Sequence, residues 1–214
     1  MAIEVLEERD VALGPLALAG MLALPADARG LIIFAHGSGS SRFSPRNRHV
    51  ADILNQSRYA TLLFDLLTTT EAADRRNVFD VGLLARRVEM AVEWVGASQF
   101  GRLPLGLFGA STGAAAALVA AARLGKSISA IVSRGGRPDL AESALANVMA
   151  PTLLIVGGDD TGVIELNEFA ARQMICSHRL QIVPGARHLF EEPGTLDRVI
   201  ELAIAWYDQY LPRA

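Results

Sequence analysis

The sequence predicts a protein of the α/β class, with an open and mostly parallel sheet of about seven or eight strands and helices on both faces. Short, fully apolar runs such as Leu31–Ala35 and Thr152–Val156 alternate with helix-like stretches. Parallel strands that helices cover on both faces have this composition. Of the 214 residues 51% are hydrophobic, so we expect one domain with a large core over residues 1–214.

The expected strands begin with an antiparallel pair, Ile3–Glu8 and Leu16–Leu24. The segment between them, "DVALGP", ends in glycine and proline, which favour a turn. The apolar runs that follow predict six more strands: Leu31–Ala35, Ala60–Phe64, Pro104–Phe108, Ile128–Val132, Thr152–Val156 and Leu180–Val183. Because helix-like stretches separate them, we expect right-handed crossovers and a parallel arrangement.

The helices are predicted from their caps and from the spacing of apolar residues. Ser44 can cap a helix whose first position is Pro45, because the N–H that proline lacks is unpaired in a first turn. Leucines and valines recur at helical spacing between Asp80 and Ala97. An alanine-rich helix after residue 113 can approach the sheet closely. The expected helices are Ser44–Ser57, Asp80–Ala97, Ala114–Leu124, Gly162–Met174 and Thr195–Leu211.

Composition excludes several classes of function. The net charge of −3 is spread over both signs, which does not favour nucleic-acid binding. No apolar run reaches the ~18 residues of a membrane span, and the acidic start "MAIEVLEERD" does not resemble a secretory signal. The one cysteine, Cys176, cannot form an internal disulfide. We therefore expect a cytoplasmic protein that binds neither membranes nor nucleic acid; the sequence leaves a homodimer open.

Polar clusters follow the apolar runs. Since the carboxyl ends of parallel strands lie along one edge of a sheet, these clusters should converge there. They include Ser111 in "GASTG", the adjacent Asp159 and Asp160 in "GGDD", and His188 in "PGARHLFEE". The order Ser, Asp, His along the chain is that of a nucleophile, an orienting acid and a base in one class of serine hydrolases. His36 also follows a strand, and we expect it to pack its own loop.

Ser111 lies in a G-x-S-x-G turn between an apolar strand and the alanine-rich helix. Such a turn forces the serine into a strained backbone conformation and presents its hydroxyl above the sheet. Gly109 and Gly113 leave room on either side. A serine hydroxyl needs a neighbouring base before it can act as a nucleophile. The N–H of Thr112, at the start of the helix, can face a developing oxyanion.

The segments "GASTG", "PTLLIVGGDD" and "PGARHLFEEPG" resemble the α/β-hydrolase superfamily, and within it the small dienelactone hydrolase-like proteins with a minimal cap domain or none. The resemblance covers most of the chain. It implies the α/β-hydrolase fold, Ser111 as nucleophile, His188 as base and Asp160 as acid. Dienelactone hydrolases proper use a cysteine nucleophile, so lactone chemistry is not implied for a chain that has serine at this position.

The residues alone do not separate the two adjacent aspartates. One of them can cap the helix that begins near Gly162, because aspartate side chains accept hydrogen bonds from the first N–H groups of a helix. We expect Asp159 to cap this helix and Asp160 to orient His188. The alternative is that Asp159 is the acid of the triad.

Loops after other strands contain further candidates. "HGSGSS" can supply the second oxyanion N–H from Ser38, or from Gly39 as the alternative, with Gly37 beside the substrate. Arg134, Arg137 and Arg42 have two interpretations. They can be solvated or ion-paired residues, or they can hold a substrate carboxylate, which a guanidinium group binds in a bidentate way.

We expect a serine hydrolase that cleaves an ester or thioester of a small acyl substrate through an acyl-enzyme. It would need no cofactor or metal, and neither an H-E-x-x-H nor a paired C-x-x-C motif is present. The insertion Leu66–Asp80 is short and polar, which predicts an open, shallow site. Two alternatives remain: a non-catalytic module of the same fold that binds a ligand or a partner protein, and an acyltransferase with the same triad.

Overall fold

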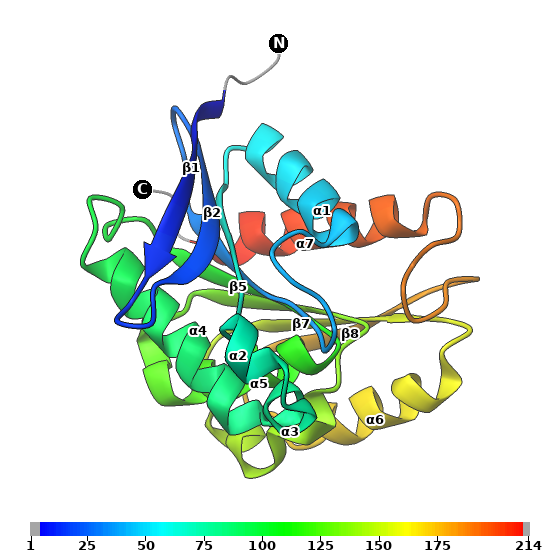
Figure 1. Cartoon of the computed structure of the whole chain (residues 1–214). Coiled ribbons are helices and arrows are strands. Elements are labelled where there is room, and N and C mark those ends of the chain that lie inside the picture. Colours follow the sequence, from blue (N-terminus) through cyan, green and yellow to red (C-terminus); the bar gives the residue numbers. More distant parts are fainter. Residues whose placement is uncertain (1–4, 212–214) are drawn as a thin grey trace.

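Eight strands form one sheet in the part of the chain that the computed structural model describes, residues 5–211 (Figure 1). Their order is β1-β2-β4-β3-β5-β6-β7-β8. At one edge, β1 (Val5–Leu13) and β2 (Leu18–Pro25) form an antiparallel hairpin, and β2 pairs antiparallel with β4. The other strands are parallel: β3 (Leu31–Ala35), β4 (Ala60–Phe64), β5 (Leu105–Ala110), β6 (Ala130–Arg134), β7 (Thr152–Gly157) and β8 (His178–Val183).

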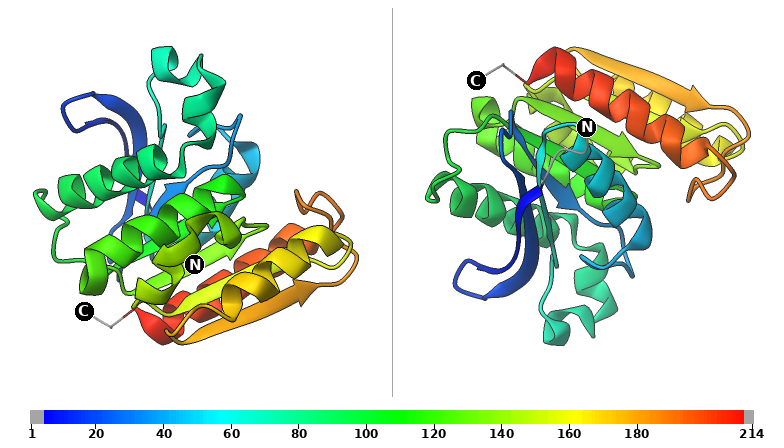
Figure 2. Two further views of the ribbon diagram at one scale, coloured as in Figure 1. Left: turned by 90° about the horizontal axis from the view of Figure 1, so that it is seen from below. Right: turned by 90° about the horizontal axis from the view of Figure 1, so that it is seen from above.

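Helices cover both faces of this sheet, and the predicted α/β-hydrolase fold is confirmed (Figures 1 and 2). On one face lie α1 (Pro45–Gln56) and α7 (Thr195–Tyr210). The other face carries α4 (Val81–Gly96), α5 (Thr112–Leu124), α6 (Thr161–Ala171) and the 3₁₀ segments η1 (Gly125–Ser127) and η2 (Pro138–Asn147). Two short helices, α2 (Thr69–Ala72) and α3 (Arg75–Phe79), follow β4. Over the described range, none of the helices combines the length and the apolar character that crossing a membrane requires.

The central strand β5 and the helix α5 pack very closely. Every residue of α5 from Thr112 to Ala121 is buried, and most of these residues are alanine or glycine. A Cβ atom added at Gly109 in β5 would lie 2.4 Å from Cα of Ala114. Small side chains on both elements therefore bring the helix backbone onto the strand, as the alanine-rich segment predicts.

The antiparallel hairpin is longer than the sequence indicated. We expected a turn to begin at Asp10, but β1 continues to Leu13. Leu13 is fully buried and pairs with Leu18, so the alternation of side chains persists through this segment. The turn is confined to residues 14–17. The first two residues of the expected strand, 3 and 4, lie outside the described range.

Four short helical segments, α2, α3, η1 and η2, are missing from the sequence prediction. They are too short for a hydrophobic period to be visible, and η2 contains Glu142 in a non-helical conformation with a φ of 47°. The signal for α2 is a capping box, in which the Thr68 side chain accepts from the N–H of Glu71 and the Glu71 carboxylate accepts from the N–H of Thr68. The strand β6 also extends two residues further than expected, which places Arg134 at its end.

Candidate active site

Ser111 occupies the tight turn between β5 and α5, with a φ of 51° and a ψ of −123°. A residue other than glycine pays about 1–3 kcal/mol for such a conformation. Gly113 is required because a Cβ there would lie 2.1 Å from the carbonyl oxygen of Ala35, at the end of β3. Together with the close contact of Gly109 on Ala114, this packing holds the turn from both sides.

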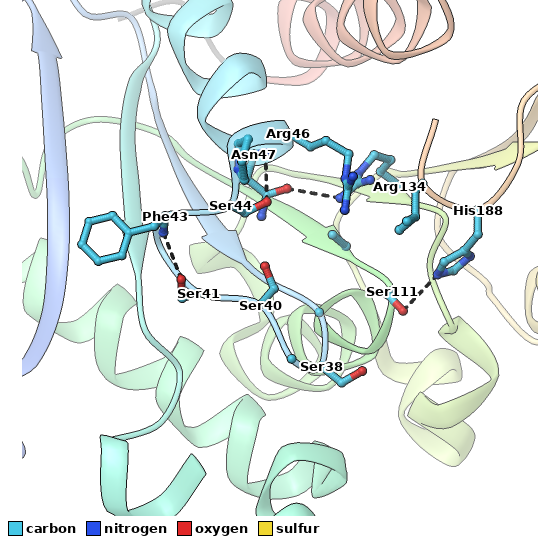
Figure 3. Close-up of a pocket in the computed structure, with 15 residues that line it drawn as sticks. Ser38, Ser40, Ser41, Phe43, Ser44, Arg46, Asn47, Ser111, Arg134 and His188 are labelled. Atoms are coloured by element: carbon cyan, nitrogen blue, oxygen red, sulfur yellow. Dashed lines mark hydrogen bonds between the residues drawn. The ribbon is translucent and has the colours of Figure 1, made fainter. Parts of the chain in front are cut away.

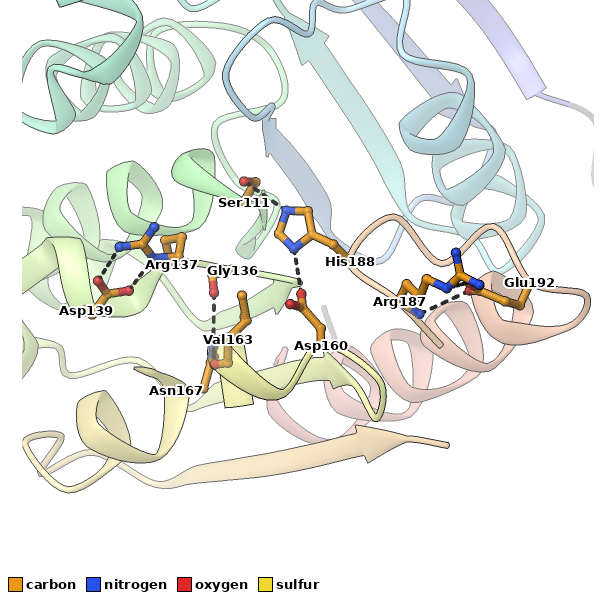
Figure 4. Close-up of polar contacts among 10 residues, drawn as sticks. All are labelled: Ser111, Gly136, Arg137, Asp139, Asp160, Val163, Asn167, Arg187, His188 and Glu192. Atoms are coloured by element: carbon orange, nitrogen blue, oxygen red, sulfur yellow. Dashed lines mark hydrogen bonds and ion pairs between the residues drawn. The ribbon is translucent and has the colours of Figure 1, made fainter. Parts of the chain in front are cut away.

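The side chains of Ser111, His188 and Asp160 form a chain of hydrogen bonds (Figure 4). Nε2 of His188 lies 3.3 Å from Oγ of Ser111, and Nδ1 of His188 lies 2.8 Å from Oδ2 of Asp160. The carboxylate can only accept, so Nδ1 carries the proton and Nε2 offers its lone pair to the serine hydroxyl. The structure thus brings together the three residues that the sequence selected.

Backbone contacts join the loop after β7 to the loop after β8. The N–H of Gly158 donates to the carbonyl of Val183 at 2.8 Å, and the N–H of Asp159 donates to the carbonyl of Ala186 at 2.9 Å. Gly157 permits this approach, because a Cβ there would lie 2.3 Å from the carbonyl oxygen of Ala186. The two loops are held in register, which fixes the carboxylate opposite the imidazole.

The two adjacent aspartates have different surroundings. Asp160 stands at the N-terminus of α6, yet its side chain makes no capping hydrogen bond and accepts from His188 instead. Asp159 is exposed. The capping role that we expected for Asp159 is wrong, because the residue at the cap position is Asp160 and α6 has no side-chain cap.

Two backbone N–H groups lie close to Ser111. Thr112 is the first residue of α5, and the N–H groups of a first helical turn have no partner within the helix. The N–H of Ser38 donates to Oγ1 of Thr112 at 2.9 Å, so this expected oxyanion donor already has an acceptor in the free protein. Gly37 lies against the serine, since a Cβ there would approach Cβ of Ser111 to 3.0 Å. Gly39, the alternative donor, follows with a φ of 70°.

A cavity of about 520 Å³ opens beside Ser111 and His188 (Figure 3). Its walls come from the loop after β3, the first turn of α1, the end of β6 and the loop that contains His188. Besides Ser111 and His188, the residues of the wall with polar side chains are Ser38, Ser40, Ser41, Ser44, Arg46, Asn47 and Arg134. Residues 5–211 contain no group of three or more His, Cys, Asp or Glu placed to hold a metal ion.

The sequence did not select Arg46 and Asn47. Both lie in the first turn of α1, directly after the loop that follows β3. This turn starts at the carboxyl edge of the sheet, so its polar residues could have been selected as candidates from the sequence. Asn47 is 2% exposed, which is unusual for its residue type and marks it as a buried polar partner.

Of the three candidate arginines, Arg134 lines this cavity, and Arg137 and Arg42 do not. Arg137 forms an ion pair with Asp139 at 2.8 Å. Arg42 forms an ion pair with Asp65, whose carboxylate also accepts the N–H of Arg42 at 2.8 Å. Arg134 is 6% exposed and donates through Nη2 to Oδ1 of Asn47 at 3.2 Å. Burial, and then repulsion by the charge of Arg46, lowers the pKa of Arg134 to about 10, so the guanidinium remains charged at neutral pH.

His36 packs its own loop, as the sequence indicated. Its Nε2 accepts the N–H of Leu66 at 3.2 Å, and its Nδ1 lies 2.9 Å from the carbonyl oxygen of Gly37. Both hydrogen bonds are satisfied by a neutral ring with the proton on Nδ1. Burial lowers the pKa of His36, against the opposing effects of the Gly37 carbonyl and the charge of Asp65.

No family model matches the chain. Comparison with curated proteins finds two relatives that are longer than this chain. The chain is 54% identical over 206 residues to two proteins of Mycobacterium tuberculosis, strains CDC 1551 and H37Rv, that are provisionally named phosphoribosyl transferases. The match covers 96% of this chain and 46% of each relative, so the chain spans less than half of their length.

Two solved structures match nearly the whole of this chain and of their own chains. A dienelactone hydrolase from Anabaena variabilis is 52% identical, with a TM-score of 0.93 that covers 96% of this chain and 99% of that one. An α/β serine hydrolase without a lid, from Xanthomonas campestris, is 21% identical with a TM-score of 0.77, covering 99% of both chains. The second likeness shows the fold alone.

The fold defines the class of the protein as an α/β-hydrolase. Within this class, the chain belongs to the dienelactone hydrolase-like group, because it shares half of its residues with the Anabaena protein over nearly the whole of both chains. The family resemblance of the three sequence segments is thereby confirmed.

The strain at the serine turn predicts a stability difference between two variants that both lack the hydroxyl. Ser111→Gly should exceed Ser111→Ala by about 1 kcal/mol in the free energy of unfolding, because glycine adopts a positive φ without a steric penalty. Urea unfolding of the two proteins measures the difference. Equal stabilities would contradict a strained turn.

Acid should destabilise the protein through His36. Its folded-state pKa lies below the ordinary 6.5, so the unfolded state binds the proton more readily. The stabilising contribution is complete above about pH 6.5 and is lost as the pH falls through the lower folded-state pKa. His36→Gln should therefore lose less unfolding free energy than the wild type between about pH 7 and pH 5, as measured by urea melts.

The exposed His178 provides the matched control for this measurement. His178→Gln should keep the wild-type dependence of stability on pH. If His36→Gln behaves in the same way, the neutral, doubly hydrogen-bonded form of His36 does not stabilise the fold.

Proposed function

We propose that the chain is a serine hydrolase that cleaves an ester or thioester of a small acyl substrate. The proposal depends on one observation: the chain of hydrogen bonds from Ser111 through His188 to Asp160, at the mouth of a cavity. A hydroxyl, a neutral imidazole and a carboxylate in this order are the arrangement that activates a serine nucleophile. Membership of the α/β-hydrolases supports it.

In the proposed acylation, Oγ of Ser111 attacks the carbonyl carbon of the substrate while its proton passes to Nε2 of His188. Asp160 stabilises the imidazolium that forms. The oxyanion accepts hydrogen bonds from the N–H groups of Thr112 and Ser38, and Ser38 exchanges the Thr112 hydroxyl for this new acceptor. The leaving alcohol or thiol then takes the proton from Nε2, and the acyl group remains on Oγ.

Water completes the reaction in the proposed deacylation. His188 removes a proton from a water molecule, which attacks the carbonyl carbon of the acyl group. Collapse of the second tetrahedral intermediate returns the proton to Ser111 and releases the acid. The imidazole side chain is 37% exposed, so water can reach it directly.

The names of the relatives need to be weighed against this proposal. The provisional name phosphoribosyl transferase belongs to proteins of which this chain matches 46%. The Anabaena relative is described as a dienelactone hydrolase, and a lactone is a cyclic ester. The span represented by this chain has the hydrolase fold, so we assign it ester hydrolysis and not phosphoribosyl transfer.

Ser111→Ala should abolish activity on a panel of esters of varied acyl length and charge. Removal of the nucleophile of such a triad lowers kcat about 10⁴–10⁶-fold. A fluorophosphonate probe should label the wild type at Ser111 and leave the variant unlabelled, as mass spectrometry can show. Near-normal turnover in a correctly folded Ser111→Ala protein would show that Ser111 is not the nucleophile. In a separate reaction of the wild type, formation of esters from added alcohols would indicate an acyltransferase.

The two adjacent aspartates provide a matched pair of variants. Asp160→Asn should lower kcat about 10⁴-fold, because the amide cannot hold the imidazole in the tautomer that accepts the serine proton. Asp159→Asn should leave kcat unchanged and should change the free energy of unfolding by no more than about 0.5 kcal/mol, because this side chain is exposed. Kinetics and thermal melts of both variants decide the assignment, and a collapse of activity in Asp159→Asn alone would transfer the role to Asp159.

A further inference from the structure

Arg134 places a positive charge at the active-site cavity without a counter-ion among residues 5–211. Its side chain is 6% exposed and lies in the cavity wall. A guanidinium group has five N–H donors. Within the described chain one hydrogen bond is formed, from Nη2 to Asn47, and Nε is buried with no acceptor. The cation is therefore desolvated by the fold and left largely unsatisfied.

Such a residue is unfavourable for folding. Buried charges in proteins are normally paired, because an apolar surrounding does not replace the hydration that the ion loses. An apolar side chain of similar length at the end of β6 would avoid this loss. A buried cation that faces a cavity is explained when a ligand supplies the missing anion.

The rest of the cavity wall also favours negative charge. Figure 3 shows the guanidinium groups of Arg46 and Arg134 close to each other above Ser111, and the Ser40 hydroxyl in the same cavity. The N-terminus of α1 begins here and has no acidic residue in its first turn. Pro45 has no N–H and the N–H of Asn47 donates to Oγ of Ser44, so the N–H that this turn can offer to a ligand is that of Arg46. Glu191 pairs with Arg46 at 2.7 Å, and its side chain is 63% exposed at the rim.

We propose that Arg134 is the centre of a subsite that binds a phosphate group of the substrate. This inference rests on the proposed hydrolase function and narrows its substrate class. A phosphate presents three terminal oxygens in different directions, which can accept from the guanidinium groups of Arg134 and Arg46, the Ser40 hydroxyl and the N–H of Arg46 at the start of α1. A carboxylate has two oxygens in one plane and would leave part of this set unused.

The subsite lies next to the reacting hydroxyl. Arg134 pairs with Ala110 across β5 and β6, and the N–H of Ser111 donates to the carbonyl of Arg134 at 3.3 Å. The side chains of Arg134 and Ser111 line the same cavity, so a phosphate held by Arg134 shares that cavity with the carbonyl carbon that Ser111 attacks. The substrate is a small ester that carries a phosphate group near the scissile bond, in keeping with a cavity of about 520 Å³.

Calorimetric titration of inorganic phosphate tests the subsite without turnover. The Ser111→Ala protein keeps the cavity and should bind phosphate saturably and more tightly than acetate at constant ionic strength. Adding Arg134→Met should weaken phosphate binding at least 10-fold. Adding Arg123→Met, which removes the same charge from an exposed ion pair with Glu89, should leave binding unchanged.

A substitute variant and the pattern of outcomes separate the possible failures. Arg134→Met leaves the buried Oδ1 of Asn47 without its donor; should this variant not fold, Arg134→Lys serves instead and should still weaken phosphate binding. Equal phosphate affinity in the Arg134 variants and their parent, or tighter binding of acetate, would overturn the subsite. Phosphate binding that depends on Arg134 in a protein with no esterase activity would preserve the subsite and reject the proposed hydrolysis.

Discussion

The backbone of Ser111 is held in a conformation that an isolated peptide would rarely adopt, and close packing around two glycines keeps it there. Gly113 lies against the end of β3, and Gly109 lies against the first turn of α5. The alanines of α5 let the helix sit directly on the strand. The strain at the serine is therefore balanced by the burial of a whole helix, and the position of the hydroxyl is set by the core of the protein.

Two places at the active-site cavity stabilise negative charge, and each lies at the N-terminus of a helix. In the proposed reaction the N-terminus of α5 faces the transient oxyanion, and the N-terminus of α1 lies at the cavity beside two arginines. The one carboxylate in the hydrogen-bonded chain, Asp160, lies behind the histidine and is held there by the contact between the β7 and β8 loops. The phosphate-bearing substrate that we propose would thus meet mainly positive groups, while Asp160 holds the imidazole from the far side.

Most of the fold could be predicted from the sequence, because the apolar runs and the helices between them each have one dominant pattern. The spacing of glycines around Ser111 and the order of Ser, Asp and His located the residues that the structure brings together. The residue at the cap position of α6 could not be predicted, because either of two adjacent aspartates has the chemistry to cap a helix. The local backbone places Asp160 there, and its carboxylate accepts from His188 and caps nothing. The sequence also could not separate Arg42 from Arg134. Arg42 forms an ion pair with Asp65, which comes from the loop after another strand, whereas Arg134 binds the neutral Asn47.

The hydrogen bond from the N–H of Ser38 to the Thr112 hydroxyl affects how strongly this N–H binds the neutral ester and how strongly it binds the oxyanion in the proposed reaction. In the free protein this N–H already has a neutral acceptor at 2.9 Å. A neutral carbonyl oxygen of bound substrate would gain little by displacing that hydroxyl, whereas an oxyanion forms a stronger, charge-assisted hydrogen bond. In the proposed reaction, the N–H of Ser38 therefore stabilises the substrate mainly after negative charge has developed on its oxygen. Its hydrogen bond then lowers the free energy of the transition state more than that of the bound ester, which increases the rate.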